Sequence, residues 1–201
     1  MEAKPGNKAT PVSLAQHSYF NLSGQGSGDV LQHHVRLWST SYTPLDNTQI
    51  PTGDIVPVHG TPFDFTEETS VGSRINEVPG GYDHNYDLRS NMQESSSSEE
   101  LSSNGNDGHT DGLRLAAKVW DPLSKRAMEV FTTAPGVQFY TGNFLDGIVG
   151  KGGAVYNIHA GLCLETQGFP NAVNEPKFPS VIVRPGETYR HVMIHKFYTQ
   201  P

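Results

Sequence analysis

Short apolar runs separated by turn-forming residues are the dominant pattern of this chain. The runs are rich in Val, Ile, Tyr, Phe and Thr, which is typical of β-strands. The predicted strands are Val12 to Leu22, Val35 to Tyr42, Leu113 to Trp120, Ala127 to Thr133, Val137 to Thr141, Val155 to Thr166, Ser180 to Arg184 and Tyr189 to Phe197. Asp121 to Lys125 supply turn residues between two of them, so an antiparallel hairpin is expected there. With no comparable helical segment, the pattern predicts an all-β antiparallel sandwich or barrel.

The alternation of side chains within two of these strands predicts which residues face away from the core. Side chains of a strand point to opposite faces in turn, so odd and even positions occupy different faces. In residues 12–22 the even positions are mostly apolar, which places His17 on the polar face. In residues 158–165 the even positions are apolar as well, so Glu165 is expected to share a polar face with His159.

The neighbours of Glu165 favour a concave site over a solvated outer face. Gly161 and Cys163 lie on the same predicted face and are small, so space is expected in front of the carboxylate. His17 stands among polar and aromatic side chains that suit a sugar. The structural alternatives are a solvated strand face for Glu165 and a histidine hydrogen-bonded within a packed sheet for His17.

The length of 201 residues fits one domain with a sizeable core. One segment differs in composition: residues 90–112 are rich in Ser, Glu, Asn and Gly and contain almost nothing to bury. We interpret them as a disordered surface insertion within a single domain spanning residues 1–201. A linker between two domains is the alternative, but neither side carries a self-contained set of strands.

Charge and composition exclude several classes of function. Lys plus Arg number 14 against 21 Asp plus Glu, and the net charge of −7 argues against nucleic-acid binding. No run approaches the ~20 apolar residues of a membrane span, and no signal peptide is evident, so we expect no membrane partner and a cytoplasmic protein. The nine histidines show no metal-binding spacing, and no metal or other cofactor is expected. Cys163 is expected to be a half-buried strand residue, with a nucleophile as the alternative.

Several motifs occur in an order that resembles the aldose 1-epimerase family, also called galactose mutarotases. They are Gln16 to Leu22, Ile50 to Gly53, Phe63 to Phe65, Gly81 to Asn85, Pro135 to Asn143, Leu164 to Gln167, Pro170 to Asn174 and Arg184 to Glu187. The resemblance covers nearly the whole chain except the Ser-rich insertion, and it is specific because several motifs recur in register. It implies a galactose mutarotase-like β-sandwich with a sugar in a concave groove.

The resemblance also implies an activity and a set of site residues. The family interconverts the α and β anomers of aldohexoses such as glucose and galactose, with no cofactor and an aldose as small-molecule partner. By resemblance, His17 is the catalytic acid and Glu165 the catalytic base. Asp83 and Gln138 correspond to residues that bind the sugar hydroxyls. A monomer is expected.

The chain departs from the family at its N-terminal side. Family members carry a substantial segment before the position of Met1, with several strands and further sugar contacts, so this chain resembles an N-terminally truncated member. Without the strands of that N-terminal segment, sheet edges or core faces are expected to stay uncovered. Two alternatives therefore stay open. One is a non-catalytic carbohydrate-binding pseudoenzyme, and the other is a glycoside hydrolase using Glu165 and Asp83, which the His17 motif disfavours.

Overall fold

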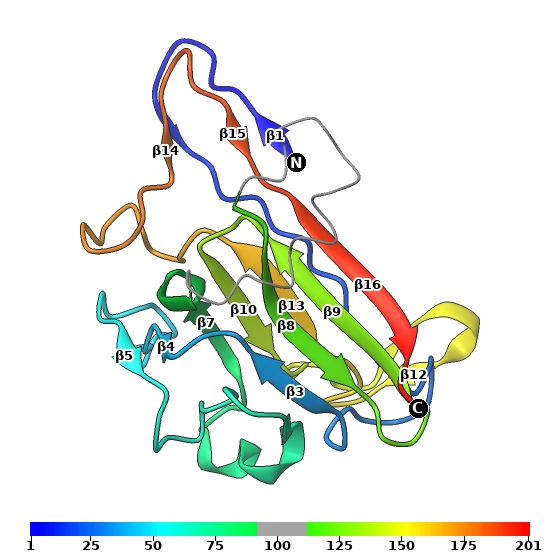
Figure 1. Cartoon of the computed structure of the whole chain (residues 1–201). Coiled ribbons are helices and arrows are strands. Elements are labelled where there is room, and N and C mark those ends of the chain that lie inside the picture. Colours follow the sequence, from blue (N-terminus) through cyan, green and yellow to red (C-terminus); the bar gives the residue numbers. More distant parts are fainter. Residues whose placement is uncertain (92–111) are drawn as a thin grey trace.

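The computed structural model describes residues 1–91 and 112–201 and shows two antiparallel five-stranded sheets (Figure 1). The first sheet has the order β13-β10-β7-β4-β5. Its strands are β13 (Cys163–Gln167), β10 (Gly136–Tyr140), β7 (Asp83–Asp87), β4 (Ser41–Tyr42) and β5 (Val56–Pro57). The second has the order β16-β9-β8-β3-β6. Its strands are β16 (Met193–Thr199), β9 (Arg126–Thr132), β8 (Arg114–Trp120), β3 (His34–Leu37) and β6 (Thr69–Ser70).

Side chains from both sheets form one apolar core. Val35 of β3 and Val130 of β9 belong to the same buried cluster as Val137 and Phe139 of β10 and Leu164 of β13, and all five have exposed fractions of 0%. Burying a side chain of this size contributes about 1.5–3 kcal/mol, so the contact between the sheets is a main source of stability. The predicted all-β antiparallel sandwich is confirmed.

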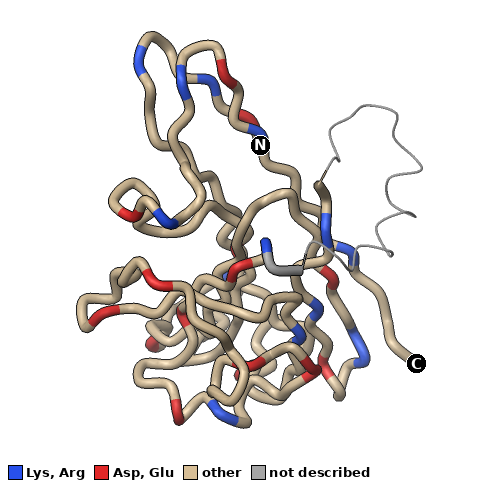
Figure 2. Tube along the Cα trace, turned by 60° about the vertical axis from the view of Figure 1, so that its left-hand side comes forward, with Lys and Arg blue, Asp and Glu red and all other residues tan. Residues whose placement is uncertain are grey.

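Paired segments from the two ends of the chain form an extension beyond the sandwich (Figure 1). There β1 (Glu2–Ala3) pairs with β15 (Tyr189–Arg190), and β2 (Thr10–Pro11) pairs with β14 (Ile182–Val183). Lys and Arg outnumber Asp and Glu along it, although the whole chain carries a net charge of −7 (Figure 2). The extension matters for the site because β2 leads directly into the segment that carries His17.

The remaining elements are short. A third strand pair consists of β11 (Ile148–Val149) and β12 (Val155–Tyr156). The helical elements of the described residues are 3₁₀ turns, namely η1 (Val71–Ser73), η2 (Ile75–Glu77), η3 (Leu88–Asn91) and η5 (Lys151–Gly153). Within those residues no helix has the length and apolar character needed to cross a lipid bilayer. The predicted insertion over residues 90–112 falls almost wholly outside the described part, and the single-domain organisation stays a prediction.

The predicted hairpin is confirmed, since β8 and β9 pair directly, with Lys118 opposite Glu129. Other strand predictions were too long. The segment 155–166 contains two separate strands, β12 and β13, joined by turns. The segment 12–22 is not a strand: its backbone bonds to scattered partners, and only Phe20 forms an isolated bridge, to Leu162.

Three further segments are interrupted or shortened relative to the prediction. The segment 35–42 is divided between β3 and β4, which belong to different sheets, so the chain crosses the sandwich at residues 38–40. The segment 189–197 is divided between β15, which pairs with β1 in the extension, and β16 of the second sheet. Within 180–184 only two residues form a strand, β14. Apolar composition alone does not show where a strand leaves one sheet for another.

Candidate active site

Three adjacent strands present polar side chains on the sheet face that points away from the core. Glu165 of β13 is paired with Gln138 of β10, and Gln138 is paired on its other side with Asn85 of β7. Gln138 stands between the buried Val137 and Phe139, so the two-residue period of a strand turns Gln138 and its register partners to the outer face. The next row across the same strands consists of Cys163, Tyr140 and Asp83. The register therefore brings together residues that are far apart in the sequence.

His17 reaches this face on a segment that is held at both ends. On one side, the amide of Gly168 donates a 3.0 Å hydrogen bond to Ser13 Oγ. On the other side, Phe20 and Leu162 exchange two backbone hydrogen bonds of 2.8 and 2.9 Å. The anchors lie at the two ends of β13, so the residues between them run along this strand, and His17 projects from them beside Glu165.

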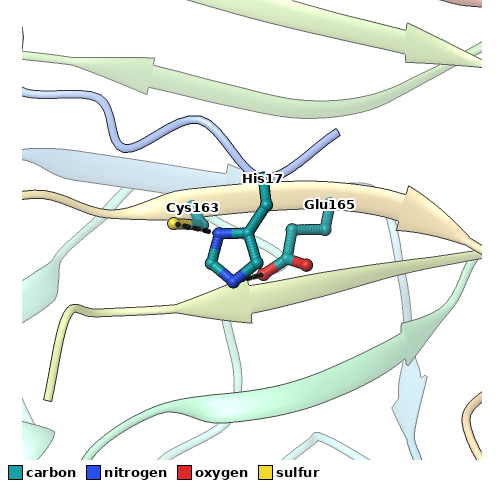
Figure 3. Close-up of side chains that lie close together, drawn as sticks. All are labelled: His17, Cys163 and Glu165. Carbon is teal, nitrogen blue, oxygen red and sulfur yellow. Dashed lines mark hydrogen bonds and ion pairs between the residues drawn. The ribbon is translucent and has the colours of Figure 1, made fainter. Parts of the chain in front are cut away.

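The imidazole of His17 lies between a thiol and a carboxylate (Figure 3). Its Nε2 is 3.5 Å from Glu165 Oε1, and its Nδ1 is 3.5 Å from Cys163 Sγ. The His17 side chain is 54% exposed, whereas that of Glu165 is only 12% exposed. Tyr19 stacks on the imidazole with ring centroids 5.3 Å apart. A ligand arriving from solvent therefore meets the imidazole and the carboxylate together.

The small residues near Glu165 make room for the His17 segment. A Cβ atom on Gly161 would lie 3.1 Å from the Cβ of Tyr19, so the glycine allows this segment to pack closely. The expectation that Gly161 and Cys163 leave open space was thus wrong in its detail, because Tyr19 and His17 fill that space.

His159 does not share a strand with Glu165, contrary to expectation. It lies in the turns before β13 with a φ of 63°, where strand alternation does not apply. Its Nδ1 lies 2.8 Å from the carbonyl oxygen of Thr141, which fixes the ring within this turn. His159 therefore has a local structural contact, and parity counting through the turn assigned its face wrongly.

Hydrogen bonds from amide side chains connect Asp83 and Gln138, the two residues predicted to bind the sugar, with Gln167 and Asn85. Gln138 Nε2 donates a 2.8 Å hydrogen bond to Asp83 Oδ1. Gln138 Oε1 accepts a 3.0 Å bond from Gln167 Nε2, which also lies 3.3 Å from Asn85 Oδ1. Because the oxygen of Gln138 is an acceptor here, its amide nitrogen is the end presented to Asp83.

Burial governs the electrostatics of the two carboxyl groups. Burial raises the pKa of Glu165, and the negative charge of Asp83 raises this pKa further, while His17 opposes both effects. Burial also raises the pKa of Asp83, against the hydrogen bond from Gln138 and the charge of His17, which lower it. A carboxylate with a raised pKa is a stronger base near neutral pH, so the environment of Glu165 suits proton abstraction.

His17, Cys163 and Glu165 also offer nitrogen, sulfur and oxygen atoms that all lie within 4.8 Å of one another. Such a donor set resembles that of zinc sites. Burial raises the pKa of the Cys163 thiol, and nearby carboxylates add to the effect. The nucleophilic form of a cysteine is the thiolate, so this environment disfavours Cys163 as a nucleophile. Cys163 is fully buried, more than the half-buried position expected from the sequence.

The structure thus brings all four predicted site residues to one face. His17 lies against Glu165, and Asp83 bonds to Gln138, which is the strand neighbour of Glu165. Their catalytic and binding roles stay predictions. Sequence reasoning assigned no role to Gln167, although its position two residues after Glu165 places it on the same face.

Comparison with known proteins identifies the family. The family model described as aldose 1-epimerase matches residues 1–196. The chain belongs to the aldose 1-epimerase family. Human galactose mutarotase is 45% identical over 193 residues, covering 95% of this chain and 51% of that protein. Aldose 1-epimerase of Escherichia coli K12 is 33% identical over 201 residues, covering 96% of this chain and 53% of that protein.

Solved structures of the aldose epimerase type share the fold. A homologue from C. elegans has a TM-score of 0.80 at 23% identity, covering 98% of this chain and 54% of that chain. Galactose 1-epimerase from Lactobacillus acidophilus has a TM-score of 0.71 at 24% identity, covering 98% of this chain and 52% of that chain. The chain spans about half the length of the curated relatives it matches.

Proposed function

We propose that this protein interconverts the α and β anomers of aldohexoses by acid and base catalysis. The observation that carries the proposal is the 3.5 Å approach of His17 Nε2 to Glu165 Oε1 on a face that solvent reaches. Membership of the aldose 1-epimerase family supports the same reaction class. The two groups come from segments 148 residues apart (165 − 17), so the fold has assembled them.

The reaction requires one proton acceptor and one proton donor at neighbouring atoms of the sugar. Glu165 removes the proton from the C1 hydroxyl, and His17 donates a proton to the ring oxygen O5. The C1–O5 bond breaks and an open-chain aldehyde forms. Rotation about C1–C2 exposes the other face of the carbonyl, and the ring closes with the two roles reversed. Each positioned acid or base typically contributes ~10²–10⁴ in rate.

Asp83 and Gln138 act in binding. Their 2.8 Å hydrogen bond fixes the two side chains relative to each other before the sugar arrives. A carboxylate accepts hydrogen bonds from hydroxyls, and an amide both donates and accepts them, so the pair suits a polyhydroxylated ring. Holding the ring with C1 at Glu165 converts the proton transfers into steps within one complex.

Optical rotation tests the proposal directly. Fresh α-D-galactose or α-D-glucose is mixed with the purified protein, and the approach to anomeric equilibrium is compared with a buffer blank. Glu165→Gln and His17→Asn are expected to abolish the acceleration, since each removes one proton-transfer group. Glu67→Gln and His59→Asn make the same changes at exposed positions outside the site and are expected to keep the parental rate.

Two outcomes would contradict the proposal. A Glu165→Gln variant with the parental rate would show that the base is another group. Sugar binding in a calorimeter without faster mutarotation would select the non-catalytic carbohydrate-binding alternative. The experiment uses the chain of 201 residues, so it also tests whether a chain that matches about half of human galactose mutarotase supports turnover.

A further inference from the structure

The side chain of Gln167 connects the proposed sugar-binding pair to a buried amide. Gln167 is the last residue of β13 and stands opposite Gly136 of β10. Its Nε2 lies 3.0 Å from Gln138 Oε1 and 3.3 Å from Asn85 Oδ1. An amide nitrogen carries two N–H groups, so each of them has an acceptor here. Gln167 thus joins a residue of β10 to a residue of β7.

Gly136 leaves the space in which Gln167 meets Asn85. Strand β10 lies between β13 and β7, so the side chain of Gln167 must pass over β10 to reach Asn85. A Cβ atom on Gly136 would lie 2.5 Å from Asn85 Oδ1, which is too close for a real carbon atom, and 3.0 Å from a ring carbon of Phe169. Asn85 is only 1% exposed, so it gives Gln167 an anchor that solvent does not reach.

The carboxylate of Asp83 sets the direction of the bonds in this chain of side chains. A carboxylate only accepts, so Gln138 turns its Nε2 towards Asp83 Oδ1, which is 2.8 Å away. The oxygen of Gln138 then faces β13 and needs a donor, which Gln167 Nε2 supplies. The amide of Gln138 is therefore held at both ends. Without Gln167, it would be held by Asp83 alone.

We propose that Gln167 is a positioning residue for sugar binding: it holds the Gln138 amide against Asp83, so that the pair meets the sugar hydroxyls in one fixed arrangement. This step rests on the proposed function, in which Asp83 and Gln138 bind the sugar. Gln167 acts through Gln138 and takes no part in the proton transfers of His17 and Glu165. Its loss should therefore weaken sugar binding and leave the chemical step nearly unchanged.

Sugar binding gives the first test. Gln167→Met keeps the length of the side chain and removes both N–H groups. We expect KM and the calorimetric Kd for D-galactose to rise at least about threefold, with kcat within about twofold of the parent. Gln32→Met makes the same change at an exposed position and should leave all three values as in the parent. A Gln167→Met variant with the parental Kd, or with a lower kcat at the parental KM, would overturn the proposal.

A double-mutant cycle distinguishes positioning through Gln138 from direct contact with the sugar. Gln138→Met removes the residue through which Gln167 is proposed to act. In that background, adding Gln167→Met should weaken galactose binding no further, because only independent effects add. Additive losses of affinity would show that Gln167 acts on the sugar or on the fold without Gln138, and would refute the proposal.

The carboxyl group of Asp83 reports on the same hydrogen bonds in the absence of sugar. Burial raises the pKa of Asp83, and the hydrogen bond from Gln138 opposes this effect. The pKa of Asp83, measured by carbon NMR on the sugar-free protein, should therefore be higher in Gln167→Met than in the parent. The titratable side chains that act on Asp83 or lie beside it are the same in both proteins; they are His17, His84, Tyr140, Cys163 and Glu165. An unchanged pKa would show that Gln167 does not hold Gln138 against Asp83.

The same measurements separate this proposal from the proposed function. If Gln167→Met weakens galactose binding and raises the pKa of Asp83, but the parent does not accelerate mutarotation, the positioning role is supported and the catalytic proposal fails. If the parent accelerates mutarotation and neither the Kd nor the pKa responds to Gln167→Met, catalysis is supported and the positioning role is refuted. If galactose does not bind to the parent, both proposals fail.

Discussion

Replacing His191 by leucine should weaken both the fold and the site, because this buried ring ties the His17 segment to the sheet. His191 is 2% exposed, and its Nδ1 lies 3.0 Å from the carbonyl oxygen of Leu14. A carbonyl can only accept, so Nδ1 carries the proton and Nε2 is the acceptor. Thr166 Oγ1 lies 2.9 Å from Nε2 and Thr132 Oγ1 lies 3.2 Å from it. Leu14 is three residues from His17, so the ring anchors the segment close to the proposed acid.

The magnitude follows from these contacts. His191→Leu removes the bond to Leu14 and the bond that the two threonines share, and a typical buried hydrogen bond contributes about 1 kcal/mol net. Leucine fills a similar volume, so no large cavity is added. We expect the free energy of unfolding to fall by about 2–3 kcal/mol. We expect kcat to fall by at least about tenfold, because small displacements of a catalytic group are costly.

The pH dependence gives a second measure of the same residue. Burial lowers the pKa of His191 below its ordinary value, while the bond to Leu14 opposes this. The unfolded chain therefore binds a proton at this position before the folded chain does, and stability falls as pH drops below about 6.5. The leucine variant lacks this contribution, so its stability should depend less on pH in that range.

Urea denaturation and optical rotation measure these effects, and His59→Leu is the control because its side chain is 97% exposed. The control should match the parent in rate and should lose only the small contribution of its exposed ion pair with Asp64. A His191→Leu variant with parental stability and parental kcat would refute the reasoning that this ring positions His17. Lost stability with unchanged kcat would limit His191 to the fold.

Three further predictions concern the site itself. Gly161→Val should lower kcat at least about tenfold by polarimetry, because its branched side chain would collide with Tyr19 and displace the histidine segment. Cys163→Ser should keep the parental rate, because burial raises the pKa of the thiol and leaves it protonated and unreactive; loss of activity with an intact fold would contradict this. As pH falls, kcat/KM should decrease with a pKa above the ordinary glutamate range, because the pKa of Glu165 is raised. Asp83→Asn removes a like charge, so this decrease should move to lower pH. An unchanged pH profile in Asp83→Asn would show that Asp83 does not raise the pKa of Glu165.

The fold was predictable from sequence where paired strands follow each other directly in the chain. The hairpin of β8 and β9 was placed within one residue of its observed bounds, because its strands are adjacent in the chain and joined by a turn-rich loop. Prediction failed where the chain changes sheet or bends. His159 illustrates the reason: a backbone with a φ of 63° interrupts the alternation of faces, and no apolar pattern reports that angle.

Strand β7 was missed although it carries Asp83. Its sequence, Asp83 to Asp87, is mostly polar and lacks the apolar composition that marks a strand. The strand forms because it is hydrogen-bonded on both sides, to β10 and β4, and because Tyr86 points into the core. Asp83 therefore entered the site prediction only through resemblance to a family. The pairing with β10 and β4 stabilises this strand, and the residues of the segment alone do not reveal that pairing.

Two different physical constraints assemble the site. Glu165, Gln138 and Asp83 are placed by strand register, and a slip of one residue in β10 would turn Gln138 into the core and Phe139 out of it. The cost of exposing Phe139 therefore protects the polar face as well as the core. His17 has no such protection, because its segment forms no ladder and depends on scattered anchors such as the hydrogen bond from His191 to Leu14. The carboxylate should consequently stay in place under perturbations that displace the imidazole, and activity should be lost before the sandwich unfolds.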